Sequence, residues 1–212
     1  DCDREFNTHT TIEIRCKNWK DLRPYETTDI APFVVASLDI ECHSSTGKFP
    51  DPKVLGDACF QIAISLVRFG TDEVYDKTCL CYKQTAPSPN ANIRSFDTER
   101  DMLMAYTDYM RKHDVDIITG WNIFGFDLHY IMERAIVTEC PPVFFQMSKI
   151  KDHVCNLTMK KLSSSALGDN TLKIVPTPGR FYFDLFHEVK KEYKLDSYKL
   201  DNVSKLYLGD QK

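Results

Sequence analysis

The stretch from Ala31 to Cys42 constrains the fold most, because a short apolar run ends there in two acidic residues. Residues 33–38 are rich in β-branched and aromatic side chains and follow a proline, which predicts a buried strand rather than a helix. Asp39 and Glu41 stand on either side of Ile40. Because side chains alternate between the two faces of a strand, both carboxylates are expected to point the same way, with Ile40 turned into the core.

Two interpretations of this acidic pair are open. Like charges at this spacing repel each other, and a central strand is a costly place for them. A divalent cation such as Mg²⁺ or Mn²⁺ would remove that cost, since both ions prefer hard oxygen ligands. Alternatively, the strand simply ends in solvent, where acidic residues are common.

The composition is typical of a globular protein: 42% of the 212 residues are hydrophobic and 27% are charged. No apolar run approaches the length of a transmembrane helix, and no signal peptide is recognisable. The first residue is not methionine, so we expect a piece of a longer protein. The eight cysteines are scattered without the C-x₂-C spacing of a zinc site, which predicts reduced thiols in an intracellular protein.

Charge is unevenly distributed along a chain whose net charge is −4. Residues 141–212 contain 12 Lys and Arg against 8 Asp and Glu, whereas the first 140 residues contain 15 against 23. An acidic half with a metal site beside a basic half fits a polyanionic substrate. The difference is also small enough to carry no meaning.

The first half of the chain predicts a sheet followed by a helix. A strand at Thr10–Cys16 lies in a segment, residues 1–30, that is expected to be a linker or the tail of a preceding domain. Strands at 59–67 and 78–82 should form an antiparallel three-stranded meander with the strand that ends at Glu41. A helix capped near Asp97 or Thr98, with Asp101 in a capping box, should bury Leu103, Tyr106 and Met110.

The second half predicts alternating strands and helices. A fourth strand at 115–120 leads to a helix that starts near Asp127, ends at Pro141 and Pro142, and buries one face: Leu128, Ile131, Met132, Ala135 and Ile136. Residues 155–170 read as a polar, irregular connection. Residues 172–175 and 181–183 should pair across Pro176–Gly179, and two helices should follow, at 185–193 and from an N-cap at Ser197 to just before Gly209.

Asp127 is expected in the first turn of a helix that directly follows a strand. There it can cap the helix and interact with the positive end of the helix dipole. In a doubly wound sheet, however, the same position lies at the rim above the strand ends, where ligands bind.

Taken together, Asp39-Ile40-Glu41 and Asn122-x-x-x-Phe126-Asp127 resemble the first two motifs of the proofreading exonuclease domain of family B DNA polymerases. The flanking segments 37–42, 116–122 and 193–200 look most like the delta-type replicative polymerase, cellular or from a large DNA virus. The resemblance implies an RNase H-like α/β fold with a central mixed sheet, in which the meander is followed by helix-linked parallel strands. It assigns residues 31–212 to the exonuclease domain.

The resemblance also implies a chemistry: hydrolysis of 3′-terminal mismatched nucleotides with two Mg²⁺ or Mn²⁺ ions. Asp39 would bridge both ions, Glu41 would hold the one that carries the attacking water, and Asp127 would support the second. Asn122 and Phe126 would line the slot for the unpaired nucleotide. The implied partners are a single-stranded primer 3′ end, the remainder of a polymerase chain and a sliding clamp. The implied location is the nucleus of a eukaryote or the host cell of a virus.

The sequence departs from the family at the fourth carboxylate. The expected Tyr-x₃-Asp occurs only at Tyr25 and Asp29, ahead of the first motif, and the alternative His-x₄-Asp is absent. We therefore expect the chain to stop before the third motif and to show little nuclease activity by itself. Asp184 is either a supporting acid or a helix cap. A free-standing 3′–5′ exonuclease and a non-catalytic nucleic-acid-binding module of the same fold remain as alternatives.

Overall fold

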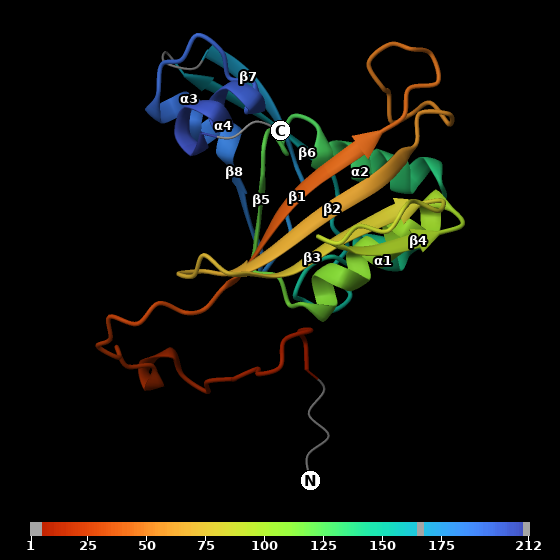
Figure 1. The fold of residues 1–212 in the computed structure, drawn as a ribbon. Helices are drawn as coiled ribbons and strands as arrows, with labels where there is room; N and C mark the ends of the chain where they lie inside the picture. The colour runs from red at the N-terminus through yellow and green to blue at the C-terminus, as the bar shows by residue number, and fades with distance from the viewer. Residues whose placement is uncertain (1–5, 165–167, 210–212) are drawn as a thin grey trace.

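A computed structural model describes residues 6–164 and 168–209, which build a six-stranded mixed sheet with the strand order β4-β3-β2-β1-β5-β8 (Figure 1). Its strands are β1 (Val34–Cys42), β2 (Cys59–Arg68), β3 (Val74–Tyr82), β4 (Asn92–Phe96), β5 (Ile117–Gly120) and β8 (Phe181–Asp184). The helices are α1 (Glu99–Lys112), α2 (Asp127–Val137), α3 (Leu185–Glu192) and α4 (Leu200–Leu208), with short 3-10 turns at Trp19–Asp21 and Pro142–Phe145. A separate hairpin consists of β6 (Thr158–Ser164) and β7 (Gly168–Ile174).

The direction of the strands decides where the acidic residues lie. β1, β2 and β3 pair antiparallel, which confirms the predicted meander. β5 runs parallel to β1, and β8 runs parallel to β5. The carboxyl ends of these three parallel strands therefore meet at one edge of the sheet, the edge at which ligands bind in open α/β sheets.

The core lies on one side of the sheet. Along β1 the buried residues alternate with exposed ones, and α1 and α2 cover the buried face (Figure 1). Thr98 caps α1 by accepting a hydrogen bond from the Asp101 N–H, as predicted, and Leu103, Tyr106 and Met110 are buried. Hydrophobic burial on this face supplies most of the driving force for the fold.

Three predictions in the first half of the chain and in α2 are wrong. Thr10–Cys16 is not a strand: Ile12 and Ile14 are 74% and 81% exposed, and no neighbouring strand pairs with the segment. β4 is an additional strand, so the one at 117–120 is the fifth. Ile136 is 61% exposed rather than buried, since it lies beyond the face of α2 that meets the sheet.

Three predictions in the last third are also wrong. Residues 155–170 are not irregular throughout, because β6 forms there and pairs with β7. Residues 172–175 and 181–183 do not pair with each other: β7 belongs to the hairpin, whereas β8 joins the main sheet beside β5. α4 begins at Leu200 instead of directly after Ser197, although it does end just before Gly209, whose φ of 70° provides the left-handed cap.

Candidate active site

The end of β1 presents two acidic side chains to one side. Asp39 and Glu41 are exposed and Ile40 is 5% exposed, as strand alternation predicts. Opposite them on β2 stand Ala63 and Gln61, neither of which adds a charge. The strand therefore delivers two carboxylates to the edge where β1, β5 and β8 end.

Asp127 lies beside this pair although it is far away in sequence. Its Oδ1 accepts a hydrogen bond from the Ile40 N–H at 3.2 Å, and its side chain is buried. Asp127 is the first residue of α2, and the N-cap position belongs to Phe126, so a capping role does not explain it. The structure thus brings residues 39, 41 and 127 to the same edge of the sheet.

The environment of Asp127 disfavours its charge. Burial raises the pKa of this carboxyl to about 7, and the negative charges of Asp39 and, more weakly, Asp184 contribute in the same direction. The N–H of Ile40 opposes part of that effect by hydrogen bonding the carboxylate. A buried carboxyl with two acidic neighbours is the arrangement that a bound cation would relieve.

Asp184 fixes the turn between β5 and α2. From the end of β8, its two carboxylate oxygens accept hydrogen bonds from the N–H groups of Asn122, at 2.8 Å, and Phe124, at 3.0 Å. It also accepts from the Phe186 N–H and so caps α3. Asp184 is therefore a helix cap that in addition holds the turn carrying Asn122.

Two glycines allow this turn to pack closely. A Cβ at Gly120 would lie 2.4 Å from the backbone oxygen of Leu38, and one at Gly125 would lie 2.3 Å from Oδ1 of Asn122. Asn122 itself has a φ of 59°, a left-handed conformation that asparagine tolerates. The Asn122 side chain therefore lies directly over Gly125.

An aromatic pair borders the site, and sequence reasoning found only one of its members. Phe126 is half-buried, and its ring lies 5.4 Å from that of Phe49, measured between centroids. Phe49 belongs to the loop between β1 and β2 and is 79% exposed. An aromatic residue in a loop rich in Ser, Gly and Pro was the only sequence signal for it.

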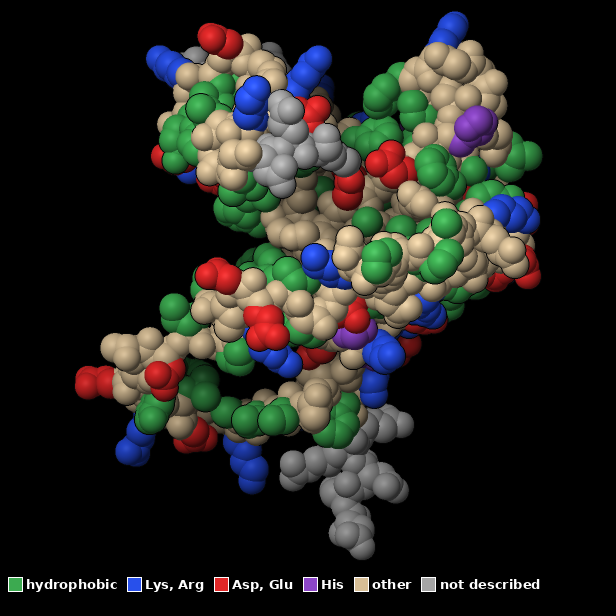
Figure 2. Space-filling model, viewed as in Figure 1, with side chains coloured by type: hydrophobic (Ala, Val, Ile, Leu, Met, Phe, Trp, Pro, Cys, Tyr) green, Lys and Arg blue, Asp and Glu red, His purple; other side chains and the backbone are tan. Residues whose placement is uncertain are grey.

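Figure 2 shows an open cleft at this edge of the sheet, between the lobe that contains α3 and α4 and the loop that follows β1. Acidic side chains line part of the cleft wall, and Lys or Arg side chains project from the α3–α4 lobe. The lobe carries Lys190 and Lys191 in the last turn of α3 and Lys205 in α4, and Lys191 lies 3.7 Å from both Glu188 and Glu192. The cleft therefore has acidic side chains on part of its wall and a lobe of mixed charge beside it.

The donor set fits divalent cations, but it is not arranged as a finished cage. Among the residues that the structure describes, no group of three His, Cys, Asp or Glu side chains stands in a metal-holding arrangement. Asp39 and Glu41 are exposed, whereas Asp127 is buried and accepts a hydrogen bond from the Ile40 N–H. Oxygen donors of this kind suit Mg²⁺ or Mn²⁺.

The one Tyr-x₃-Asp of the chain lies elsewhere. Tyr25 is 86% exposed, and it belongs to the segment that leads into the start of β1, away from the end at Glu41 (Figure 1). Nine residues of extended strand separate the two ends, which corresponds to about 30 Å. Tyr25 and Asp29 therefore do not join the acidic residues.

Comparison with known proteins decides the family. Residues 2–203 match the family model for the exonuclease domain of DNA polymerase family B. The chain belongs to this family. It is 37% identical over 187 residues to the DNA polymerase delta catalytic subunit of Oryza sativa subsp. japonica, and 36% identical over 183 residues to that of Bos taurus. It is also 32% identical over 211 residues to a DNA polymerase of Paramecium bursaria Chlorella virus NY2A.

These alignments cover 88%, 86% and 97% of the exonuclease-domain chain, but only 17%, 16% and 23% of the three relatives. The chain thus spans less than a quarter of the length of the proteins it matches. Within the two ranges described, none of the helices is both long and apolar enough to span a bilayer. The seven cysteines in these ranges are free thiols, while Cys2 lies outside them.

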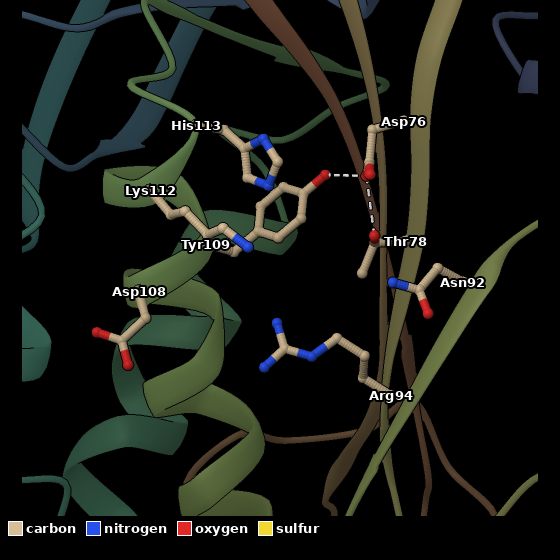
Figure 3. Close-up of a pocket in the computed structure, with 8 residues that line it drawn as sticks. All are labelled: Asp76, Thr78, Asn92, Arg94, Asp108, Tyr109, Lys112 and His113. Atoms are coloured by element: carbon tan, nitrogen blue, oxygen red, sulfur yellow. Dashed lines mark hydrogen bonds between the residues drawn. The ribbon is translucent and has the colours of Figure 1, made fainter.

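The exonuclease domain has a second polar hollow, between α1 and the β3–β4 edge (Figure 3). It encloses about 360 Å³ and is lined by Asp76, Thr78, Asn92, Arg94, Asp108, Tyr109, Lys112 and His113. The Asp76 carboxylate accepts hydrogen bonds from the hydroxyls of Tyr109 and Thr78. The hollow shares no residue with the acidic cluster at the end of β1.

Proposed function

We propose that this chain is the proofreading domain of a delta-type DNA polymerase and that it removes mismatched nucleotides from DNA 3′ ends. The observation that supports this proposal is the hydrogen bond from the Ile40 N–H to Asp127, which holds Asp127 beside the strand segment that carries Asp39 and Glu41 in a chain of the exonuclease family. The one-sided mixed sheet, with parallel strands following an antiparallel meander, supports assignment to the RNase H-like fold.

Asp39, Glu41 and Asp127 would hold two divalent ions, Mg²⁺ or Mn²⁺. When bound, such ions make a water molecule nucleophilic at neutral pH and neutralise the charge that develops on the leaving oxygen. The role of the chain is to supply anionic oxygens at fixed positions. Asp127 would do so from the first residue of α2, which is hydrogen-bonded to β1, and Asp39 and Glu41 would do so from the end of β1 itself.

Asn122, Phe126 and Phe49 would receive the unpaired 3′ nucleotide. The two rings offer faces on which a base can stack without regard to sequence. Asp184 holds the turn that carries Asn122, through the N–H groups of Asn122 and Phe124. The lysines of the α3–α4 lobe would attract the phosphate backbone into the cleft.

The expected partners are a primer 3′ end and the palm, fingers and thumb of a longer polymerase chain, with a sliding clamp as a further partner. The relatives named above come from a plant, an animal and a virus, which supports a location in the nucleus or in an infected host cell. Of the alternatives, a free-standing exonuclease would lack polymerase motifs elsewhere in its gene. A non-catalytic module would not need a buried carboxyl such as that of Asp127, whose pKa is raised by burial and by the charge of Asp39.

A metal titration of the 212-residue chain tests the site. Mn²⁺ should bind weakly to the wild-type chain, and the double substitution Asp39→Ala with Glu41→Ala should abolish that binding. The matched control is Asp72→Ala with Glu73→Ala in the exposed β2–β3 turn, which removes the same charge and should leave binding intact. Equal Mn²⁺ affinity in the wild-type chain and in the Asp39/Glu41 variant would refute the assignment.

A further inference from the structure

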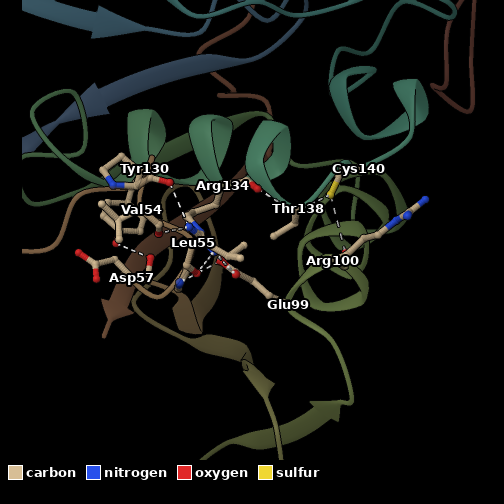
Figure 4. Close-up of polar contacts among 11 residues, drawn as sticks. Val54, Leu55, Asp57, Glu99, Arg100, Tyr130, Arg134, Thr138 and Cys140 are labelled. Atoms are coloured by element: carbon tan, nitrogen blue, oxygen red, sulfur yellow. Dashed lines mark hydrogen bonds and ion pairs between the residues drawn. The ribbon is translucent and has the colours of Figure 1, made fainter. Parts of the chain in front are cut away.

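The loop between β1 and β2, residues 43–58, is held by a buried ion pair that the proposed chemistry does not use (Figure 4). Arg134 in α2 is 1% exposed, and its Nε and Nη2 donate to the two carboxylate oxygens of Glu99 at 2.8 and 2.6 Å. Glu99, the first residue of α1, also accepts from the Cys59 N–H at 2.9 Å. The pair thus connects both helices with the start of β2.

The remaining donors of Arg134 hold the loop itself. Nη1 donates to the carbonyls of Pro52, at 3.1 Å, and Val54, at 2.7 Å, and Nη2 donates to that of Leu55 at 3.2 Å. A guanidinium has five N–H groups, and these contacts use all of them. A lysine, with three donors, could not replace the set.

A second anchor ties the loop to itself and to α2. The buried Asp57 carboxylate accepts from the N–H and hydroxyl of Ser45 and from the Asp51 N–H. The Tyr130 hydroxyl donates to the Asp57 carbonyl at 2.8 Å. Because Ser45 and Asp51 lie on either side of Phe49, these bonds fix both ends of the short segment that carries its ring.

Phe49 has little else to hold it. Its ring is 79% exposed and touches the edge of Phe126, which in turn lies 5.1 Å from Tyr130 between ring centroids. An exposed phenylalanine buries little apolar surface, so packing does little to hold its ring in place. The position of the ring therefore depends on the backbone of its loop. Asp57 holds that backbone through Ser45 and Asp51, while Tyr130 and Arg134 hold Asp57 and residues 52–55 from α2.

We propose that Arg134 is a positioning residue for the 3′-terminal nucleobase. By fixing loop 43–58 it holds Phe49 against Phe126, so that the exposed ring of Phe49 is a preorganised platform for an unpaired base. The inference rests on the proposed function, since it requires that the cleft receives a DNA 3′ end. It adds a residue that touches neither metal nor DNA and acts through Phe49.

The test is the affinity of the 212-residue chain for two tetranucleotides labelled with fluorescein at the 5′ end. One is tetrathymidylate, and the other carries an abasic residue at its 3′ terminus. Fluorescence anisotropy should show that Phe49→Ala and Arg134→Met each weaken binding of tetrathymidylate about tenfold, the loss typical of one stacked base. Binding of the abasic oligonucleotide should change less than twofold, and the double variant should bind no more weakly than Phe49→Ala.

Arg134→Met leaves Glu99 buried without its partner and can prevent folding, so Tyr130→Phe serves as a second variant. It removes only the hydroxyl bond to the loop, and we expect a threefold loss that is again confined to tetrathymidylate. Thr138→Val is the matched control: it removes a hydroxyl bond of 2.7 Å to the Arg134 carbonyl on the same helix, away from the loop. Its affinity for both oligonucleotides should equal that of the wild-type chain.

Two results would overturn the inference and are distinguishable from each other. If the wild-type chain binds and the variants weaken both oligonucleotides equally, or if the effects of Arg134→Met and Phe49→Ala add, Arg134 only stabilises the domain. If the wild-type chain binds neither oligonucleotide, the proposed function fails and this inference fails with it.

Discussion

The charge of Asp127 should destabilise the metal-free domain, and Asp127→Asn tests this directly. The pKa of the carboxyl is raised to about 7 by burial, by Asp39 and by Asp184. The folded chain therefore favours the protonated form. Asparagine removes the charge but keeps an oxygen that can accept the hydrogen bond from the Ile40 N–H.

The magnitude follows from the pKa. A rise from the ordinary value of 3.8 to about 7 corresponds to about 4 kcal/mol at 1.36 kcal/mol per unit. Because the pKa of the folded state is the higher one, the stabilisation by the protonated carboxyl is complete below pH 3.8 and is lost as the pH rises to about 7. At pH 8 in EDTA, Asp127→Asn should be more stable than the wild-type chain by about 2 to 4 kcal/mol, and at pH 4 the two should be equal.

Urea denaturation at pH 4 and pH 8, in EDTA and in Mn²⁺, measures this difference. A ligand at 100 times its Kd stabilises the folded state by about 2.7 kcal/mol. Mn²⁺ should therefore stabilise the wild-type chain and reduce the difference in stability between it and Asp127→Asn at pH 8. Asp72→Asn, in the exposed β2–β3 turn, is the control and should change stability at neither pH. The reasoning would be refuted if Asp127→Asn were less stable than the wild-type chain at pH 8 in EDTA. It would also be refuted if the variant were more stable than the wild-type chain by the same amount at pH 4 and at pH 8.

Three further outcomes are expected. Asp184→Ala leaves the N–H groups of Asn122 and Phe124 without their acceptor and should cost about 2 to 4 kcal/mol, with faster amide exchange at both residues; unchanged exchange would contradict the role given to Asp184. The 212-residue chain should excise a mismatched 3′ nucleotide very slowly, because no Tyr-x₃-Asp joins Asp39, Glu41 and Asp127, and rapid turnover would show that another residue replaces that motif. Cys16 is exposed and should react with a thiol reagent within minutes, whereas the buried Cys59, whose pKa is raised well above its usual range, should react only on unfolding; equal rates would argue against the burial described.

Local patterns predicted the parts of the fold that depend on neighbours in sequence. The alternation around Ile40 gave the common face of Asp39 and Glu41, and Thr98 with Asp101 gave the start of α1. Each of these depends on a few consecutive residues. The meander was also predictable, because its strands are consecutive in sequence and a short turn joins β2 to β3.

Pairings between distant segments were not predictable in the same way. β4 was missed because no residue of Asn92–Phe96 is buried, so it has no apolar alternation to reveal it. β6 is polar and becomes a strand only through its pairing with β7. Thr10–Cys16 shows the reverse. Its apolar and polar residues alternate as in a strand, but no neighbouring strand in the described part of the chain forms hydrogen bonds with its backbone.

The position of Asp127 depends on one face of α2, and the same face organises the loop beside it. Asp127, Tyr130 and Arg134 are spaced i, i+3 and i+7, so they lie along a single side of the helix. The first accepts from the backbone of β1, the second donates to the backbone at Asp57, and the third donates to three loop carbonyls. Any displacement of α2 would therefore move the Asp127 carboxylate and the loop that carries Phe49 together. A pair of apolar side chains in place of Arg134 and Glu99 could fill the same space, but it would offer no donors to the loop carbonyls. The buried ion pair therefore does what apolar packing cannot: it connects α2 to the loop by hydrogen bonds.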